Sequence, residues 1–384
     1  TFVFSNLIGL RQSKVQRLLG YSSVGQMALM TTAAALIYRP GAEAAMLVVI
    51  GGLFVNHLFA KVGLFWLAGY VGRERLRDWS LAGHPAAIVI FGILIAAIAG
   101  LPPFPGFFAK WQFILMIAAD HRYLVIALIL IGSLLEAAYM FRWFGHAVHR
   151  DDTRLYARPA ELLPIYGMGA LLIVSGAIVA LLAGIDAHFV ALPLVAGLAV
   201  WLAWNLPARL QGVFALVLVL GAGIGLIREL SGLSQLYAAI LLSGGVVVSI
   251  GCLARTEPRP GFYPLLAVML LSLPALARAS TSLEFLVIWE LITLSSYFLV
   301  LQRRTAIPHA LLYLLFSLAA AFFLLVGFAL MHAAAGTISL SAFRTAGPDV
   351  PAVFVLLAIG FLIKAGAAGV HVWLPGTYAE SYDD

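Results

Sequence analysis

Long apolar runs, separated by short polar segments, repeat along nearly the whole chain. Most runs contain about 20 residues, which is the length that an α-helix needs to cross the hydrocarbon core of a bilayer. The pattern predicts the end of one helix before Arg11 and further helices at residues 22–38, 42–71, 85–119, 123–148, 163–184, 188–205, 211–227, 236–254, 262–279, 283–302, 307–333 and 350–375. We therefore expect an all-α polytopic transmembrane helix bundle with about 12–13 spans.

Two of the predicted helices are discontinuous, the first near residues 100–106 and the second near residues 364–370. They contain the sequences GLPPFPG and KAGAAGV, respectively. If the first counts as two crossings, the first two arginine-rich segments lie opposite the others. If it counts as one, all of these segments fall on the same side of the membrane: residues 11–17, 73–77, 150–158, 209, 255–259 and 303–304. The positive-inside rule assigns that side to the cytoplasm. The two discontinuous helices then run in opposite directions, as in inverted repeats, and such helices commonly frame ion sites near the bilayer midplane.

The composition agrees with a membrane protein. Hydrophobic residues make up 63% and charged residues 10% of the 384 positions, whereas a soluble domain has about 25% charged residues. The formal charge of +6 comes from arginines between the apolar runs, so it concerns topology and lipid headgroups rather than nucleic acid. A single cysteine, Cys252, excludes an internal disulfide and a cysteine-ligated cluster. The sequence starts at Thr1 and stops at Asp384 within its pattern, so we expect truncation at both ends.

Lysine is rare in this chain. Of its four lysines, Lys61, Lys110 and Lys364 lie inside stretches that are otherwise almost wholly apolar. An ammonium group in hydrocarbon costs several kcal/mol unless it is paired or hydrated, and lysine, unlike arginine, can release its proton when buried. These three lysines are therefore candidates for groups that bind and release protons.

Three motifs resemble successive signatures of a known family. They are KVQRLLGYSSVGQM at residues 14–27, NHLFAKVGLF at 56–65 and GLPPFPGFFAK at 100–110. In this order they are similar to motifs of the antiporter-like subunits of respiratory complex I, of hydrogenase-4 and formate hydrogenlyase-type membrane hydrogenases, and of multisubunit Na⁺/H⁺ antiporters. Two later segments, IWEL at 288–291 and residues 363–375, resemble signatures from the other half of the same module.

The order of these motifs is the reverse of the order within one family module. The simplest explanation is that residues 1–186 form the C-terminal part of a first antiporter-like module, and residues 187–384 the N-terminal part of a second. Both parts would then be incomplete in this sequence.

The resemblance implies roles for residues of the second part. Glu290 matches the family glutamate that interacts with a lysine, here Lys364, and a changing distance between them would change the lysine's affinity for protons. His371 matches a histidine on the conducting path. The residues also have structural explanations: Glu290 could hydrogen-bond a neighbouring helix, Lys364 could extend to the membrane surface, and His371 could be an ordinary polar residue near a helix end.

In the first part, Lys110 matches the family lysine through which protons leave, although it could merely satisfy carbonyl groups freed by the nearby prolines. His57 and Lys61, one helical turn apart, match the central hydrophilic axis, with a helix-packing hydrogen bond as the alternative. Glu136 departs from the family pattern. It could pair with Arg142 or join Lys110 as an exit-path carboxylate. Three residues at predicted span ends should face lipid headgroups: Glu284, Arg39 and Arg122.

The leading hypothesis is proton translocation by a subunit of a redox-driven complex related to complex I or hydrogenase-4. The chain shows no catalytic triad, phosphate loop or metal-ligand cluster, so we expect no cofactor, no metal and no redox chemistry of its own. Its partners would be other membrane subunits, with iron–sulfur subunits elsewhere, in the cell inner membrane. A subunit of a multisubunit Na⁺/H⁺ antiporter is an alternative. A non-conducting scaffold is another, because Gly366 and Gly369 stand where many family members have proline.

Overall fold

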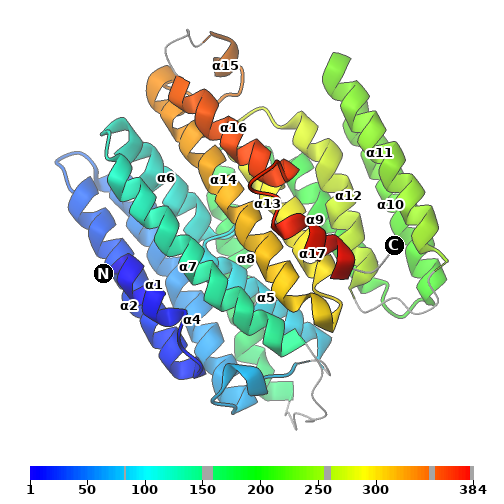
Figure 1. Cartoon of the computed structure of the whole chain (residues 1–384), viewed down its shortest axis with the longest axis horizontal. Coiled ribbons are helices and arrows are strands. Elements are labelled where there is room, and N and C mark those ends of the chain that lie inside the picture. Colours follow the sequence, from blue (N-terminus) through cyan, green and yellow to red (C-terminus); the bar gives the residue numbers. More distant parts are fainter. Residues whose placement is uncertain (82–83, 149–158, 255–260, 346–350, 381–384) are drawn as a thin grey trace. The chain divides into compact units, whose positions relative to one another are not determined.

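A computed structural model describes residues 1–81, 84–148, 159–254, 261–345 and 351–380. These residues form helices joined by loops and turns, without β-strands (Figure 1). Within them, seven helices are long and apolar enough to cross a membrane, at residues 43–71, 123–148, 162–182, 208–228, 232–252, 282–300 and 307–335. Shorter apolar helices cover residues 85–99, 105–119, 190–202, 262–278 and 351–365. The predicted all-α polytopic bundle is therefore confirmed.

The chain divides into two compact units. Unit 1 comprises Thr1–Ala183, Leu325–Gly336 and Ala352–Leu356. Its helices up to Ala183 are α1 (Phe2–Gly9), α2 (Val15–Ile37), α3 (Glu43–Met46), the π-helical turn η1 (Leu47–Gly51), α4 (Gly52–Val71), the 3₁₀ turn η2 (Leu76–Asp78), α5 (Pro85–Ala99), α6 (Pro105–Ala119), α7 (Tyr123–Val148) and α8 (Pro159–Leu182).

Unit 2 comprises Gly184–Leu324, Thr337–Pro351 and Leu357–Asp384. The remaining elements of the chain are α9 (Ala187–Leu202), α10 (Ala208–Arg228), α11 (Gly232–Cys252), α12 (Phe262–Arg278), α13 (Ser282–Val300), the 3₁₀ turn η3 (Arg304–Ala306), α14 (Ile307–Ala335), α15 (Ala342–Thr345), α16 (Pro351–Ala365) and α17 (Trp373–Glu380). The end of α14 and the beginning of α16 are assigned to unit 1.

The core of unit 2 lies around α12, which packs against α9, α10, α11 and α13. Leu266, Leu270 and Leu271 on α12 are buried there. In contrast, α10 and α11 present exposed apolar side chains such as Val217 and Val247. Such a surface suits contact with lipid chains, because exposure of apolar side chains to water is unfavourable.

The break between α5 and α6 lies where the sequence predicts it. α5 ends at Ala99 and is followed by Gly100, whose φ of +75° is readily adopted only by glycine. Pro105 begins α6 at a position where its missing N–H costs nothing. Each helix has 15 residues and is therefore about 22 Å long at 1.5 Å per residue. Neither alone reaches across a hydrocarbon core of about 30 Å, as expected for two halves of one interrupted crossing.

The second break follows the same principle. α16 ends at Ala365, and two glycines with positive φ, Gly366 at +69° and Gly369 at +92°, lie before α17 begins at Trp373. Glycine can therefore interrupt this helix without the prolines that are present in the first break. The predicted helix at 350–375 is thus two helices, and the break covers residues 366–372.

One helix boundary differs clearly from the prediction. α2 begins at Val15 rather than near residue 22. Its first turns are amphipathic: Val15, Leu18 and Leu19 are buried, whereas Gln16 and Arg17 are exposed. Burial of one apolar stripe is enough to keep these turns helical. A search for wholly apolar segments does not detect such turns.

Candidate functional site

A buried carboxylate lies at the centre of unit 1. Glu136, in the middle of α7, is completely buried. Its Oε1 accepts a hydrogen bond of 2.6 Å from Ser22 Oγ, and its Oε2 accepts one from Gln26 Nε2. Ser22 and Gln26 lie four residues apart on α2, so both side chains reach the carboxylate from one helix face. The carboxylate is thus held by two neutral donors.

Two buried lysines accompany Glu136. Lys61 on α4 donates to the backbone carbonyl of Leu19 at 2.9 Å, and Lys110 on α6 donates to Ser133 Oγ at 3.1 Å. Both ammonium groups interact electrostatically with the Glu136 carboxylate. We call Glu136, Lys61 and Lys110, with the side chains that hydrogen-bond them, the unit 1 cluster. Its three titratable groups come from three different helices, and each group is almost fully shielded from solvent.

The structure distinguishes between the two interpretations of Glu136. Arg142 uses its guanidinium to donate to the carbonyl of Leu10 at 2.7 Å and to that of Gln12 at 3.0 Å. The predicted pairing of Glu136 with Arg142 is therefore absent. In the alternative, Glu136 accompanies Lys110, and the charges of both Lys110 and Lys61 act on the buried carboxyl. A role of Glu136 as an exit-path carboxylate stays a prediction.

The helix break positions Lys110. The side chain of Lys110 folds back against Gly100, so that a Cβ atom added at Gly100 would lie 2.5 Å from Lys110 Nζ. On the other side of the break, Asn56 of α4 donates from Nδ2 to the carbonyl of Ala97 at 2.8 Å. This carbonyl, in the last turn of α5, also accepts the backbone N–H of Gly100 at 3.0 Å, so the amide ties α4 to the capped end of α5. A lysine and an asparagine together line the break.

His57 precedes Lys61 by one turn on α4, as the sequence predicts. Its Nδ1 and the Oδ1 of the neighbouring Asn56 are buried and have no hydrogen-bond partner within the described parts of the chain. The positive charge of Lys61 acts on the His57 ring. Within the described residues, His57 therefore lies beside the unit 1 cluster with its Nδ1 unpaired. Lys61 does form a hydrogen bond between helices, as the alternative explanation of this pair required.

The second site is in unit 2, where Lys364 near the end of α16 is surrounded by hydroxyl groups. Its Nζ donates to Thr293 Oγ1 at 3.1 Å, to the Tyr313 hydroxyl at 3.1 Å and to Ser317 Oγ at 2.9 Å. Thr293 belongs to α13, and the other two residues belong to α14. The three N–H groups of the ammonium are therefore all used within the protein. Lys364 does not extend to the membrane surface as the alternative required.

Glu290 on α13 is buried, with 3% of its surface exposed. Its Oε2 has no hydrogen-bond partner within the described residues. The charge of Lys364 acts on Glu290, yet the ammonium binds the three hydroxyl groups and forms no ion pair with the carboxylate among the pairs that the structure describes. The ring of Trp289 lies 5.7 Å from Lys364 Nζ. The predicted partners are thus neighbours that are not in direct contact.

His371 lies apart from this pair. The residue is exposed in the segment between α16 and α17, and its Nδ1 accepts a hydrogen bond of 3.3 Å from the amide of Gly369. This local contact resembles that of an ordinary polar residue near a helix end. A role of His371 in conduction stays a prediction.

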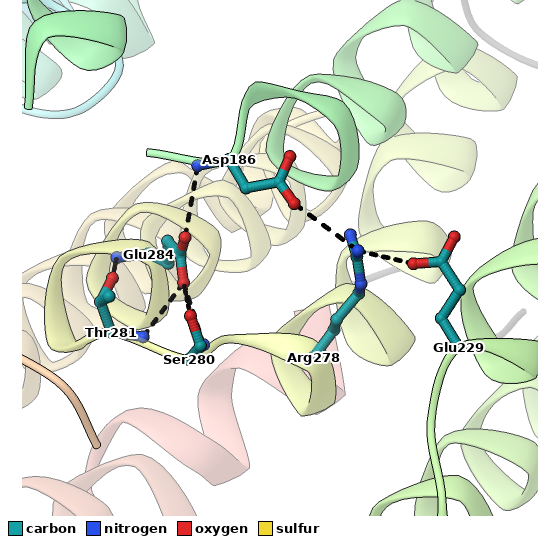
Figure 2. Close-up of polar contacts among 6 residues, drawn as sticks. All are labelled: Asp186, Glu229, Arg278, Ser280, Thr281 and Glu284. Atoms are coloured by element: carbon teal, nitrogen blue, oxygen red, sulfur yellow. Dashed lines mark hydrogen bonds and ion pairs between the residues drawn. The ribbon is translucent and has the colours of Figure 1, made fainter. Parts of the chain in front are cut away.

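One expectation about charged residues is wrong. Glu284 does not face lipid headgroups, since it is 3% exposed and completes a capping box with Thr281 at the start of α13. Figure 2 shows that its carboxylate also accepts hydrogen bonds from Ser280 and from the amide of Asp186, while Arg278 forms ion pairs with Asp186 and Glu229. The sequence signal was present, because Thr281 followed by an acid at the third position is typical of a helix start.

Arg39, also expected to face headgroups, forms an ion pair with Asp120. It thereby joins the end of α2 to the end of α6. Arg122 is exposed.

Sequence reasoning missed the hydroxyl and amide side chains of both sites. These residues are Ser22, Gln26, Asn56, Ser133, Thr293, Tyr313 and Ser317. Ser22, Gln26 and Asn56 stand within the quoted motifs, and polar residues inside apolar spans are a usable signal because each must find a partner there. The others lie in runs where serine, threonine and tyrosine more often bond their own helix.

Comparison with known proteins identifies the family to which the chain is related. Residues 1–136 and 279–382 match the transmembrane family described as NADH:quinone oxidoreductase/Mrp antiporter. The chain is 30% identical to NADH-quinone oxidoreductase subunit N of Desulforudis audaxviator over 168 residues, which is 42% of this chain and 32% of that protein.

Two further relatives are similar over shorter stretches. NAD(P)H-quinone oxidoreductase subunit 2 of Prochlorococcus marinus is 30% identical over 142 residues, 36% of this chain and 28% of the relative. Hydrogenase-4 component B of Escherichia coli is 33% identical over 120 residues, 30% of this chain and 18% of the relative. The chain thus covers about a third or less of the length of each of these relatives.

Proposed function

The chain belongs to the NADH:quinone oxidoreductase/Mrp antiporter transmembrane family, and from this premise we propose that it translocates protons through relays of lysine, glutamate and histidine side chains. The observation that carries the proposal is the unit 1 cluster, in which Lys61, Lys110 and Glu136 are buried together. Keeping three titratable groups in a membrane interior is costly, and a purely structural element would gain nothing from that cost.

In unit 1, the proton path would run through His57, Lys61, Glu136 and Lys110. Glu136 lies close enough to both lysines for their charges to interact, so a proton lost by one changes how firmly the other groups hold theirs. Lys110 stands at the α5–α6 break, where carbonyl groups freed from the helix can hold water. The break thus offers Lys110 a route for proton release.

In unit 2, the relay would run through Glu290 and Lys364, with His371 beyond them. An approach of the ammonium to the carboxylate, or its withdrawal, changes the electrostatic environment of both groups. Alternation between these two arrangements would let Lys364 take up a proton in one and release it in the other. Glu290 is suited to receive the lysine because one of its buried oxygens has no hydrogen-bond partner in the described parts of the chain.

The two relays would belong to two modules, with residues 1–186 completing the first and residues 187–384 beginning the second. The match of the family to two separate stretches supports this organisation. The arginine-rich segments would face the cytoplasm from an inner membrane. The chain would assemble with other membrane subunits, and peripheral partner subunits that carry iron–sulfur clusters would supply the energy. The printed names support such an assembly, because the relatives are a subunit of NADH-quinone oxidoreductase and a component of hydrogenase-4.

The test is proton pumping by the native complex in inside-out membrane vesicles. Glu290→Gln and Lys364→Met should each abolish pumping while the complex still assembles. Glu43→Gln, at an exposed position of α3, is the matched control and should pump normally. Unchanged pumping in both variants of the buried pair would refute the relay in unit 2.

The family description also includes Mrp antiporters, so coupling to sodium is the second candidate. Transport that requires sodium, and that continues without any redox substrate when a sodium gradient is imposed, would favour the antiporter. Pumping at an unchanged rate in sodium-free medium would favour the redox-driven proton pump.

A further inference from the structure

The hydroxyl groups around Lys364 form a site of their own. Thr293, Tyr313 and Ser317, which we call the hydroxyl cage, accept all three hydrogen bonds that an ammonium group can donate. Thr293 and Ser317 are at most 2% exposed. Tyr313 and Ser317 lie four residues apart on one face of α14. Three neutral oxygens thus bind the ammonium group of a half-buried lysine near the end of an apolar helix.

The cage competes with Glu290 for the same ammonium group. Glu290 and Thr293 are three residues apart on α13, which corresponds to about 4.5 Å along the helix axis and places both near one face. The long side chain of lysine can cover that distance by changes of rotamer. Glu290 Oε2 is buried without a partner among the described residues, so an alternative acceptor stays unused while the hydroxyl groups hold the lysine.

We propose that the hydroxyl cage is a second station for Lys364, and that its three residues are positioning residues which hold the lysine away from Glu290 in one half of the cycle. The inference rests on the proposed relay through Glu290 and Lys364. Without the cage, departure from the carboxylate would leave three N–H donors unsatisfied in an apolar interior, which is strongly unfavourable. The cage removes that penalty and makes the separated state accessible.

The size of the effect follows from the hydrogen bonds that are lost. A hydrogen bond to a charged group changes an equilibrium by about tenfold to a hundredfold. Removal of two hydroxyl groups should therefore shift Lys364 almost completely toward Glu290. A lysine that stays at the carboxylate cannot complete the alternation, so pumping should fall by about tenfold or more.

The experiment uses variants that remove hydroxyl groups while keeping side-chain shape, in the native complex. Thr293→Val and Tyr313→Phe, separately and together, should slow pumping in vesicles. Thr293→Ser keeps the hydroxyl and should restore most of the rate. The matched control is Ser295→Ala on the same helix, because Ser295 is buried but donates only to the carbonyls of its own helix. This control should pump like the wild type.

A cryo-electron microscopy structure of the Thr293→Val/Tyr313→Phe variant supplies a second readout. The inference predicts that Lys364 Nζ lies within 4 Å of a Glu290 oxygen, the distance of an ion pair. If the lysine keeps its position and the variant pumps normally while Glu290→Gln abolishes pumping, the cage has no such role and the relay stands. If Glu290→Gln also pumps normally, the proposed function itself is refuted.

Discussion

Replacement of Gly100 by alanine should misplace Lys110 without unfolding the protein. Gly100 adopts a φ of +75° at the end of α5, a conformation that costs an alanine about 1–2 kcal/mol. The added Cβ would lie 2.5 Å from Lys110 Nζ, although ordinary contacts begin at 3.4 Å. The nearest atom is the end of a flexible side chain, so the ammonium group moves and the backbone stays.

The displacement can be estimated from these distances. The gap between 2.5 Å and 3.4 Å means that Nζ must move by 0.9 Å, starting from a hydrogen bond of 3.1 Å with Ser133. A misplacement of about 1 Å in a reacting group can cost about a hundredfold in rate. We therefore expect proton translocation to decrease by up to about a hundredfold, with a loss of stability limited to about 1–2 kcal/mol.

Gly41→Ala isolates the backbone contribution. Gly41 has a φ of +84° and no atom within 4 Å of the position where a Cβ would lie, so alanine there introduces similar strain without a clash. Thermal unfolding in detergent should give similar losses of stability for Gly100→Ala and Gly41→Ala, whereas pumping in vesicles should decrease only in Gly100→Ala. Equal pumping by the two variants would refute the view that the break positions Lys110.

Three further predictions concern charged groups in and around the units. In a double-mutant cycle, Glu136→Gln and Lys110→Met should show a coupling of about 1–3 kcal/mol in thermal unfolding, because each single change leaves a buried charge without its partner; additive effects would exclude a charged pair. Glu284→Ala should destabilise the protein by about 1–3 kcal/mol through loss of the α13 cap and its buried hydrogen bonds, and an unchanged melting temperature would contradict this. The hydrogen bond from Lys14 lowers the pKa of the Glu74 carboxyl below its ordinary value of 4.5. This exposed pair therefore stabilises the folded state above pH 4.5, and the stabilisation is lost as the pH falls through the lowered pKa. Glu74→Gln should therefore unfold at a lower temperature than the wild type above pH 4.5, and this difference should disappear as the pH falls below that range.

Much of the architecture could be predicted from sequence because a membrane imposes simple rules. The apolar runs give the helices, and the GLPPFPG segment gives the break at Gly100, since proline and glycine act locally on the backbone. The start of α2 could not be found in this way. Its first turns are stabilised by burial of Val15 and Leu18 within unit 1, which is a property of the packed protein.

The candidate sites were predictable only in part. Buried lysines and glutamates stand out because a charge is rare in an apolar run. Their partners could not be assigned, since neither Glu136 and Ser22 nor Lys364 and Ser317 are close in sequence. A contact between helices depends on how they are rotated and packed, which spacing along one helix does not reveal. The separation of Lys364 from Glu290 likewise could not be predicted, because it depends on the conformation of the lysine side chain.

The number of protons translocated per catalytic turnover of the complete complex tests the central claim most directly. It should be measured in vesicles for the wild type, Lys110→Met, Lys364→Met and Lys14→Met, the last being a control at an exposed lysine. Lys110→Met and Lys364→Met should each abolish or strongly reduce translocation, whereas Lys14→Met should leave it unchanged. A full complement of translocated protons in both Lys110→Met and Lys364→Met would contradict it.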